Sequence, residues 1–237
     1  MNDDFEPERS REPDPLDSGP PLYTTMSHLR AVRRLRPDPI PDEVLGRVLQ
    51  AACWAPSGGN QQPWRVVVVR DPEGRRALAD LYAPEWARFS EGYGARLEAL
   101  DPEGQAKLQR VIDAGDHLAE HLAEAPVILV FCADFRRMAV TDRDLDRLSL
   151  IGGASVYPAV QNTMLACVAE GLGCTLTTLH CFREPDVQAA LNIPTEWATA
   201  AMVPLGYPVG GGHGPIARLG PDMLAYGDRF GSPLELD

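Results

Sequence analysis

Residues 152–172 place the tightest constraint on how this chain can fold. They have the length of a helix, and small or apolar side chains occupy nearly every face of it, among them Ala154, Val156, Ala159, Val160, Leu165, Ala166 and Val168. A helix without a polar face must be buried, either in the centre of a subunit or between subunits. Gly171 and Gly173 are expected to cap its C-terminal end. Other elements must therefore cover this helix.

Apolar patterning predicts the elements that could cover it. Helices are expected over 43–54 (with Asp42 as N-cap), 107–123 and 185–191, and the pattern from 71 to 125 is helical with a less regular middle, one helix continuing through Leu78 and Leu81. Strands are expected at four places: 64–70 and 126–131, both buried on both faces, 174–179 and 198–205. Residues 82–105 carry several aromatic side chains, Pro84 and glycines without a clean period, which predicts an irregular, lid-like excursion.

The stretch from Ala55 to Trp64 joins the predicted helix over 43–54 to the first strand. Pro56 stops the helix, and the glycines at 58 and 59 remove Cβ atoms that would hold a ligand away. Ser57 and Asn60 add donors and acceptors at short reach. An ordinary helix–strand loop is the alternative interpretation.

Four arginines lie close together between residues 29 and 36. On a helix, Arg30, Arg33 and Arg34 would share one face. In a chain of net charge −12, such a set suggests an anion, and phosphate fits the guanidinium group well. The alternative is a solvated basic face that is neutralised by the protein's own carboxylates.

Composition narrows the class of protein and its partners. Residues 1–21 are rich in Pro, Asp and Glu and predict a disordered tail, which leaves residues 22–237 as a single domain. The acidic balance argues against nucleic acid and anionic membranes as partners. Five cysteines without a C-x-x-C pair predict buried free thiols in a reducing compartment. With no apolar run long enough to span a bilayer and no signal-peptide pattern, we expect a cytoplasmic protein.

His117, Glu120 and His121 match the H-x-x-E-H spacing of zinc peptidases. The same residues arise by chance on a helix rich in alanine and glutamate, and no third ligand is indicated downstream. We therefore assign no metal ligand, and a zinc hydrolase is kept as the alternative from another functional class.

Four segments, taken together and in this order, resemble the FMN-dependent nitroreductase family over about residues 26–231. They are Arg30-Ala31-Val32-Arg33-Arg34-Leu35 with Pro39-Ile40-Pro41; Ala55-Pro56-Ser57 with Asn60 and Gln62-Pro63-Trp64; Gly171-Leu172-Gly173 with Thr177-Thr178; and Gly206-Tyr207-Pro208 followed by Arg218. Each motif alone is weak, and the set is specific. The resemblance implies an α+β fold, with a central mostly antiparallel sheet wrapped by helices, in an intertwined homodimer with FMN at the subunit interface.

The same resemblance implies roles for residues of this chain. Arg30 and Arg33, with Ala31 between them, would bind the FMN phosphate, and Arg218 would close from the C-terminal side. The flavin would contact the segment Pro56, Ser57, Gly58 and Asn60 of the other subunit, and also Gln161, Thr177, Thr178 and Leu179. The family often has Arg-Arg-Ser where this chain has Leu29-Arg30-Ala31, so one cation and one hydroxyl for the phosphate are missing.

The implied activity is a ping-pong reduction in which NAD(P)H reduces the flavin and a flat, electron-poor acceptor such as a nitroarene or quinone is then reduced. No side chain need act as acid or base, so no catalytic residue is assigned. Two alternative functions would also use a bound flavin. One is a different redox reaction with poor NAD(P)H use, such as dehydrogenation, reductive dehalogenation or flavin fragmentation. The other is a storage protein without turnover.

Overall fold

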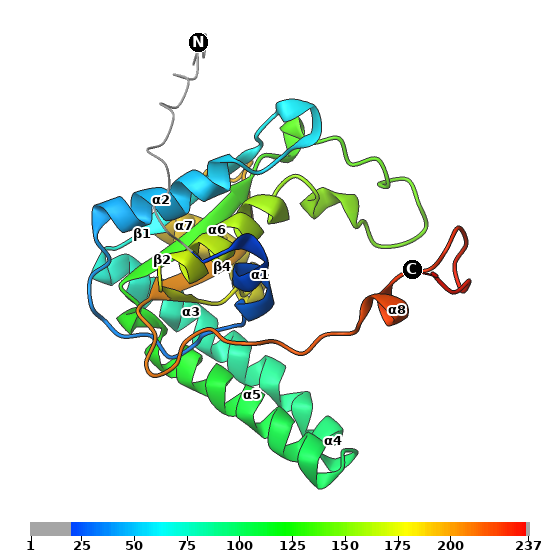
Figure 1. Ribbon diagram of the computed structural model, residues 1–237. Helices are drawn as coiled ribbons and strands as arrows, with labels where there is room; N and C mark the ends of the chain where they lie inside the picture. The colour runs from blue at the N-terminus through cyan, green and yellow to red at the C-terminus, as the bar shows by residue number, and fades with distance from the viewer. Residues whose placement is uncertain (1–19, 236–237) are drawn as a thin grey trace.

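A four-stranded antiparallel sheet lies at the centre of the computed structural model, which describes residues 20–235 (Figure 1). The strands follow the order β1 (Trp64–Val69), β2 (Val127–Ala133), β4 (Ala198–Gly206) and β3 (Gly173–Cys174). Every neighbouring pair is antiparallel, which confirms the predicted α+β class. The strand predicted over 174–179 is wrong in its extent: β3 ends at Cys174, and Thr177 forms only an isolated bridge with Met202. The tail predicted over 1–21 lies, up to residue 19, outside the described residues.

Strand β2 is the centre of the core because it pairs with β1 on one edge and with β4 on the other. All seven of its side chains are buried, as the apolar run predicts. Successive side chains of a strand point to opposite faces, and β2 therefore supplies both halves of the core. Leu129 and Phe131 belong to one cluster, and Ile128 and Val130 belong to the other.

Helices cover both faces of the sheet and give the molecule three layers. On one face lie α2 (Asp42–Cys53) and α6 (Tyr157–Ala169), which pack against each other. On the other lie α3 (Pro72–Glu91), α5 (Pro102–His121) and α7 (Glu184–Leu191). The prediction of α2 is confirmed, except that Asp42 is its first helical residue and Pro41 occupies the N-cap position.

Strand β1 corrects the expectation that residues 64–70 are buried on both faces. Only Trp64 and Val69 are buried, and Arg65 is exposed. The reason lies in the order of the sheet: β1 is an edge strand, with β2 as its single neighbour.

Helix α6 is shorter than the predicted 152–172. It begins at Tyr157, after a 3-10 turn over Ile151–Gly153, and ends at Ala169. Gly171 then adopts a left-handed conformation with φ of 70°, and the N–H of Leu172 donates to the carbonyl of Cys167 at 2.8 Å. This closes the helix as predicted for Gly171, whereas Gly173 opens β3.

The expectation of an irregular excursion over 82–105 is wrong. Helices α3 and α5, with the short α4 (Tyr93–Glu98) between them, form a helical hairpin that extends beyond the sheet (Figure 1). Asp71 and Asp101 cap the two long helices by accepting from Gly74 N and Gly104 N, each at 2.8 Å. Across the hairpin, the indole N–H of Trp86 donates to Asp116 Oδ1 at 2.7 Å.

Residues 29–36 do not form a helix on which Arg30, Arg33 and Arg34 would share one face. The first described helix, α1 (Leu22–His28), ends just before this segment, which runs extended beside β3. The N–H of Val32 donates to the carbonyl of Cys174 at 2.8 Å, and Leu35 forms an isolated bridge with Pro208. These long-range contacts override the local helical spacing of the arginines.

The C-terminal segment leaves the body of the molecule after residue 218 and contains the short helix α8 (Pro221–Leu224) (Figure 1). Leu224 and Phe230 on this arm are 74% and 93% exposed. Leu148, on the connection between β2 and α6, is 90% exposed. Such side chains on two protruding segments mark surfaces that could contact another chain.

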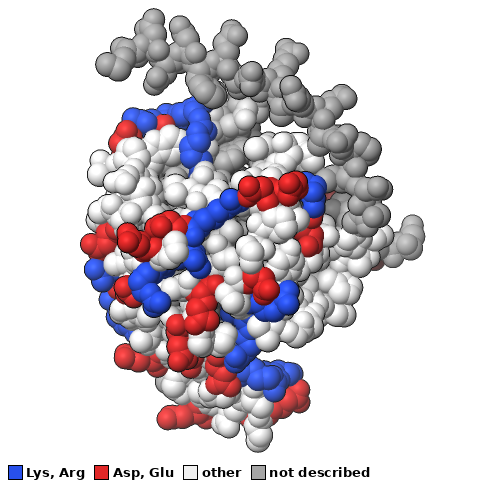
Figure 2. Space-filling model, turned by 90° about the vertical axis from the view of Figure 1, so that its left-hand side faces the viewer, with Lys and Arg blue, Asp and Glu red and all other residues white. Residues whose placement is uncertain are grey.

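The surface charges are mixed in sign, and the cysteines are unpaired. The face drawn in Figure 2 interleaves basic and acidic side chains instead of presenting one continuous basic surface. None of the helices within residues 20–235 has the length and apolarity needed to cross a membrane. All five cysteines are free; Cys132, Cys167 and Cys174 are buried, whereas Cys53 and Cys181 are exposed, contrary to the expected burial.

Candidate functional site

A cavity of about 390 Å³ opens between α1, α6 and β3. Its volume lies within the range of cofactor and small-ligand sites. Four parts of the chain supply its walls: α1 with the extended segment after it, helix α6, strand β3 with the two residues that follow, and the segment after β4. The lining residues are Met26, Leu29, Arg30, Ala31, Arg33, Gln161, Met164, Cys174, Thr175, Leu176, Ile216 and Arg218.

The segment 208–218, called the strap below, closes one side of this cavity. It runs beside residues 27–35 and is held there by main-chain bonds, from Val209 N to Arg34 O at 2.9 Å and from Ile216 N to Ser27 O at 3.1 Å. Gly212 has a φ of 60°, and a Cβ there would lie 2.8 Å from Pro208 Cγ. The strap therefore needs glycine at this turn in order to reach the pocket.

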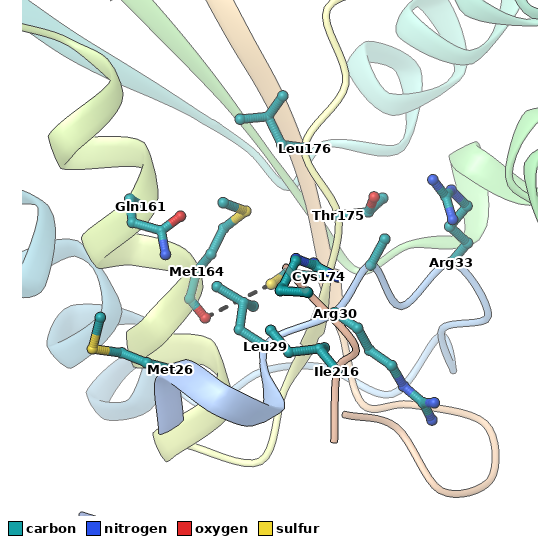
Figure 3. Close-up of a pocket in the computed structure, with 12 residues that line it drawn as sticks. Met26, Leu29, Arg30, Arg33, Gln161, Met164, Cys174, Thr175, Leu176 and Ile216 are labelled. Carbon is teal, nitrogen blue, oxygen red and sulfur yellow. Dashed lines mark hydrogen bonds between the residues drawn. The ribbon is translucent and has the colours of Figure 1, made fainter. Parts of the chain in front are cut away.

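Positive charge gathers on one side of the cavity. Figure 3 shows the side chains of Arg30 and Arg33 on one side and those of Met26, Met164 and Gln161 on the other. Among the ion pairs formed within the described part of the chain, none involves Arg30, Arg33 or Arg218. The pocket thus combines three guanidinium groups that have no carboxylate partner among residues 20–235 with an apolar and amide-bearing wall.

The remaining arginines of the motif have other partners. The guanidinium of Arg34 donates to His117 Nδ1 at 3.0 Å, and Arg36 pairs with Asp38 at 3.4 Å. The alternative of a basic face that the protein neutralises itself therefore fits Arg36, whereas Arg30 and Arg33 line the cavity.

Thr177, Thr178 and Leu179 continue directly from the cavity wall formed by Thr175 and Leu176. The main-chain N–H and carbonyl of Thr177 both bond to Met202 at 2.9 Å, and Thr177 Oγ1 accepts from Leu179 N at 3.3 Å. Tyr82 is buried against the Thr177 side chain. Burial raises the pKa of this phenol, opposed by its hydrogen bond with Thr177.

The segment from Pro56 to Asn60 does not line this cavity. It lies after the C-terminal end of α2, where Ser57 Oγ accepts from Gln62 N at 2.9 Å and Ser155 Oγ accepts from Gly58 N at 3.1 Å. Asn60 and Gln62 have positive φ values of 53° and 46°. Two non-glycine residues in this conformation make a strained loop, a feature that clusters at functional sites.

Seven lining residues were not predicted from the sequence: Met26, Leu29, Met164, Cys174, Thr175, Leu176 and Ile216. Some could have been found from spacing: Met164 lies one helical turn after Gln161, and Ile216 lies two residues before Arg218. Cys174 to Leu176 immediately precede the predicted Thr177. The other positions depend on the path of the strap, which local patterns do not predict.

The histidine motif on α5 is engaged in other contacts. The rings of His117 and His121 lie 4.2 Å apart between centroids, and His121 Nδ1 lies 3.0 Å from Glu124 Oε1. Burial and the neighbouring Arg34 charge lower the pKa of His117. Within residues 20–235, no group of three or more His, Cys, Asp or Glu side chains is arranged to hold a metal ion.

Comparison with known proteins gives consistent matches over most of the chain. The profile of the nitroreductase family matches residues 28–207. A protein named NADH dehydrogenase from Thermus thermophilus is 35% identical over 191 residues, which cover 80% of this chain and 87% of that protein. A 5,6-dimethylbenzimidazole synthase from Rhodospirillum rubrum is 35% identical over 189 residues, which cover 76% of this chain and 78% of that protein.

A solved structure shows the same fold. Iodotyrosine deiodinase, crystallised with FMN and 3-iodo-L-tyrosine, superposes with a TM-score of 0.60 at 25% sequence identity. The superposition covers 84% of this chain and 94% of the deiodinase chain.

Proposed function

The chain belongs to the nitroreductase family of FMN-dependent oxidoreductases, and on that premise we propose that the cavity between α1, α6 and β3 holds FMN. The observation that carries this proposal is the set of Arg30, Arg33 and Arg218 at a cavity of about 390 Å³. Guanidinium groups bind phosphate through paired, charge-assisted hydrogen bonds. The donor set and the volume both fit a flavin mononucleotide.

Each wall of the cavity has a role in this proposal. Arg30 and Arg33 would hold the phosphate from the N-terminal side, Arg30 through Nη1 because its Nε and Nη2 donate to Gly212 O. Arg218 would hold it from the strap. Leu29 and Ala31 stand where the family often has a cation and a hydroxyl. The three arginines would therefore bind the phosphate without those two groups. Gln161 and Met164 on α6 would lie against the flavin part of the cofactor.

The segment 177–179 would face the redox-active edge of the flavin. Thr177 has both main-chain groups committed to Met202, and the N–H of Leu179 is directed to Thr177 Oγ1. Among the hydrogen bonds of the described residues, the N–H of Thr178 has no protein acceptor. We infer that Thr178 supplies the donor that tunes the flavin, with Tyr82 and Met202 fixing the segment around it.

A second copy of the chain would complete the site. Pro56, Ser57, Gly58 and Asn60 lie away from the cavity of their own subunit. The exposed apolar side chains of the C-terminal arm and of the 138–150 connection give a partner chain surfaces to cover. An intertwined homodimer would bring the Pro56–Asn60 loop of one subunit to the flavin of the other.

Sedimentation of the protein before and after removal of residues 219–237 tests the homodimer. We expect a dimer that weakens on truncation, and a monomeric full-length protein would contradict it.

The proposed reaction is the reduction of a nitroaromatic or quinone-like acceptor with electrons from NAD(P)H. FMN, when bound, supplies reversible transfer of electrons between the two. The residues of this chain bind and orient the cofactor, and leave one side of it open so that reductant and acceptor can occupy the same place in turn. Solvent supplies protons, so no side chain is assigned as an acid or base.

A second candidate is a different flavin-dependent redox reaction with poor use of NAD(P)H. Similarity to the 5,6-dimethylbenzimidazole synthase and to the iodotyrosine deiodinase structure favours it. Anaerobic titration of the FMN-loaded protein with NADPH and NADH separates the two candidates. Prompt bleaching of the flavin absorbance supports the reductase. A flavin that stays oxidised in excess of both nucleotides supports the second candidate and contradicts the first.

A further inference from the structure

His213 lies where three parts of the chain meet. It belongs to the strap, its Nε2 donates to the carbonyl of Leu172 at 2.9 Å, and its Nδ1 accepts from the N–H of Arg30 at 3.4 Å. The imidazole is half-buried and stands outside the set of residues that line the cavity. One side chain of the strap therefore joins the turn between α6 and β3 to the segment that carries the arginines.

The two partners of His213 determine which ring nitrogen carries the proton. A main-chain carbonyl can only accept a hydrogen bond, so the proton lies on Nε2, which faces Leu172. A main-chain N–H can only donate, so Nδ1 faces Arg30 as a bare acceptor. Both ring nitrogens of the neutral imidazole are thus used, and the bond to Arg30 requires an unprotonated Nδ1.

Leu172 is a firm anchor for this imidazole. The residue is fully buried, and its N–H donates to Cys167 O at 2.8 Å where α6 closes. The neighbouring Gly173 packs so closely against the segment before α2 that a Cβ there would lie 2.7 Å from Val32 Cγ1. The core therefore fixes this turn, and it fixes a side chain that is bonded to the turn as well.

Arg30 is held at both ends by two consecutive residues of the strap. His213 accepts from its main-chain N–H, and Gly212 O accepts from Nε and Nη2 of its guanidinium at 3.0 Å and 2.7 Å. The bond from Gly214 N to His28 O at 3.0 Å fixes the strap beside this segment. The imidazole sets where the arginine side chain starts, and the Gly212 carbonyl sets its direction, which leaves Nη1 for an anion.

Holding the arginine in place affects how strongly it can bind an anion. A free arginine side chain has many rotamers, and ordering it on binding costs free energy. Where the folded protein already holds the side chain, that entropy is lost on folding and no longer weakens the binding of a phosphate. A residue that orients Arg30 should therefore strengthen phosphate binding without touching the phosphate.

We propose that His213 is a positioning residue of the phosphate site: it orients Arg30, and so gives the protein part of its preference for a phosphorylated flavin over an unphosphorylated one. The imidazole acts through Arg30 and makes no contact with the phosphate. The inference rests on the proposed function, because that function places the FMN phosphate at Arg30.

The test measures the dissociation constants of FMN and riboflavin, whose ratio reports the contribution of the phosphate. Four full-length proteins are compared: wild type, His213→Leu, Arg30→Ala and the double variant. Burial lowers the pKa of His213, but the Cys174 thiol and the Leu172 carbonyl near it raise the pKa overall. The titrations are therefore run at about pH 8.5, where the imidazole is neutral.

His213→Leu should lower the preference for FMN roughly three- to tenfold, the effect of one lost hydrogen bond, while riboflavin binding changes little. In the Arg30→Ala background the same substitution should change the preference less than about twofold, because no guanidinium is left to orient. Equal losses with and without Arg30 would mean that His213 acts on the strap as a whole, and would overturn the inference. An unchanged ratio in His213→Leu would overturn it too.

Two further variants separate the two hydrogen bonds of His213, and they carry the test if His213→Leu does not fold. Asparagine keeps an acceptor near the position of Nδ1, whereas glutamine keeps a donor near the position of Nε2. The FMN preference should be closer to wild type in His213→Asn than in His213→Gln, and an equal or reversed order would overturn the inference. His28→Leu is the matched control: its imidazole bonds to Thr24 O at 2.8 Å within α1, and the wild-type ratio should remain.

The wild-type protein separates this inference from the proposed function. If wild type prefers FMN over riboflavin and the His213 variants keep that preference, only this inference fails. If wild type binds neither flavin, or binds both equally, the proposed phosphate site fails, and the inference fails with it.

Discussion

The guanidinium of Arg30 donates two hydrogen bonds to the main-chain carbonyl of Gly212, from Nε at 3.0 Å and from Nη2 at 2.7 Å, and so joins residues 182 positions apart. This contact fixes a phosphate-binding candidate to the strap that also carries Arg218.

Gly212→Ala should weaken FMN binding. A left-handed φ costs a residue with a Cβ about 1–2 kcal/mol, and the added atom would press on Pro208. If the strain is released by loosening the strap, FMN affinity should fall roughly tenfold. Gly211→Ala is the matched control, because no atom lies within 4 Å of its Cβ position. Equal dissociation constants for the two variants, measured by flavin fluorescence, would show that the strap does not hold the site.

Gly115→Ala should destabilise the helical hairpin. A Cβ at Gly115 would overlap the indole ring of Trp86, which is fixed by its hydrogen bond to Asp116. Overpacking of this kind costs about 1–3 kcal/mol, which urea unfolding can measure. Gly46→Ala on α2 has open space around its Cβ and should be neutral or slightly stabilising. A Gly115→Ala protein as stable as wild type would contradict the packing described here.

The free energy of unfolding should fall in mild acid because His180 is buried. Burial, opposed by the nearby Glu184 carboxylate, lowers the pKa of this fully buried imidazole from 6.5 to about 4. Between these pH values the unfolded chain binds a proton that the folded chain does not. The contribution of neutral His180 to the free energy of unfolding is therefore complete above about pH 6.5. It is lost as pH falls toward 4, which lowers the free energy of unfolding by up to about 3 kcal/mol.

Urea unfolding at pH 7.5 and at pH 4.5 measures this loss. His180→Leu should reduce the difference between the two pH values, whatever its effect on absolute stability. His28→Gln, at a half-buried histidine on α1, is the control substitution. A His180→Leu protein with the wild-type pH dependence would show that other groups cause it.

The sequence predicted most of the core and only part of the site. Strand β2 lies close to where apolar patterning places it because all of its side chains are buried, and α7 lies within one residue of its predicted bounds. The segment 29–36 is extended instead because Val32 and Leu35 bond to β3 and the strap, contacts with no local signal. Helix was predicted at both ends of the α3–α5 hairpin, but the stretch 82–105 was not, because its order depends on Trp86 crossing Gly115, which are 29 positions apart in the sequence.

The candidate site was likewise predicted only in part. Arg30, Ala31, Arg33, Gln161 and Arg218 were predicted from motifs and line one cavity. Cys174 and Ile216 were not predicted, because only the packing of β3 and the strap brings them to the cavity. The assignment of Pro56, Ser57, Gly58 and Asn60 to the flavin of a partner subunit stays a prediction.

The most direct test of the central claim is the ratio of the dissociation constants of riboflavin and FMN for wild type and for Arg30→Ala/Arg218→Ala. Riboflavin lacks the phosphate, so this ratio isolates the contribution of the arginines. Each charged hydrogen bond is worth about 1.5–3 kcal/mol, and the double variant should lose roughly a hundredfold or more of the FMN preference while riboflavin binding changes little. Arg34→Ala, whose side chain bonds to His117 outside the cavity lining, should keep the wild-type ratio. An unchanged ratio in the double variant would contradict the phosphate site.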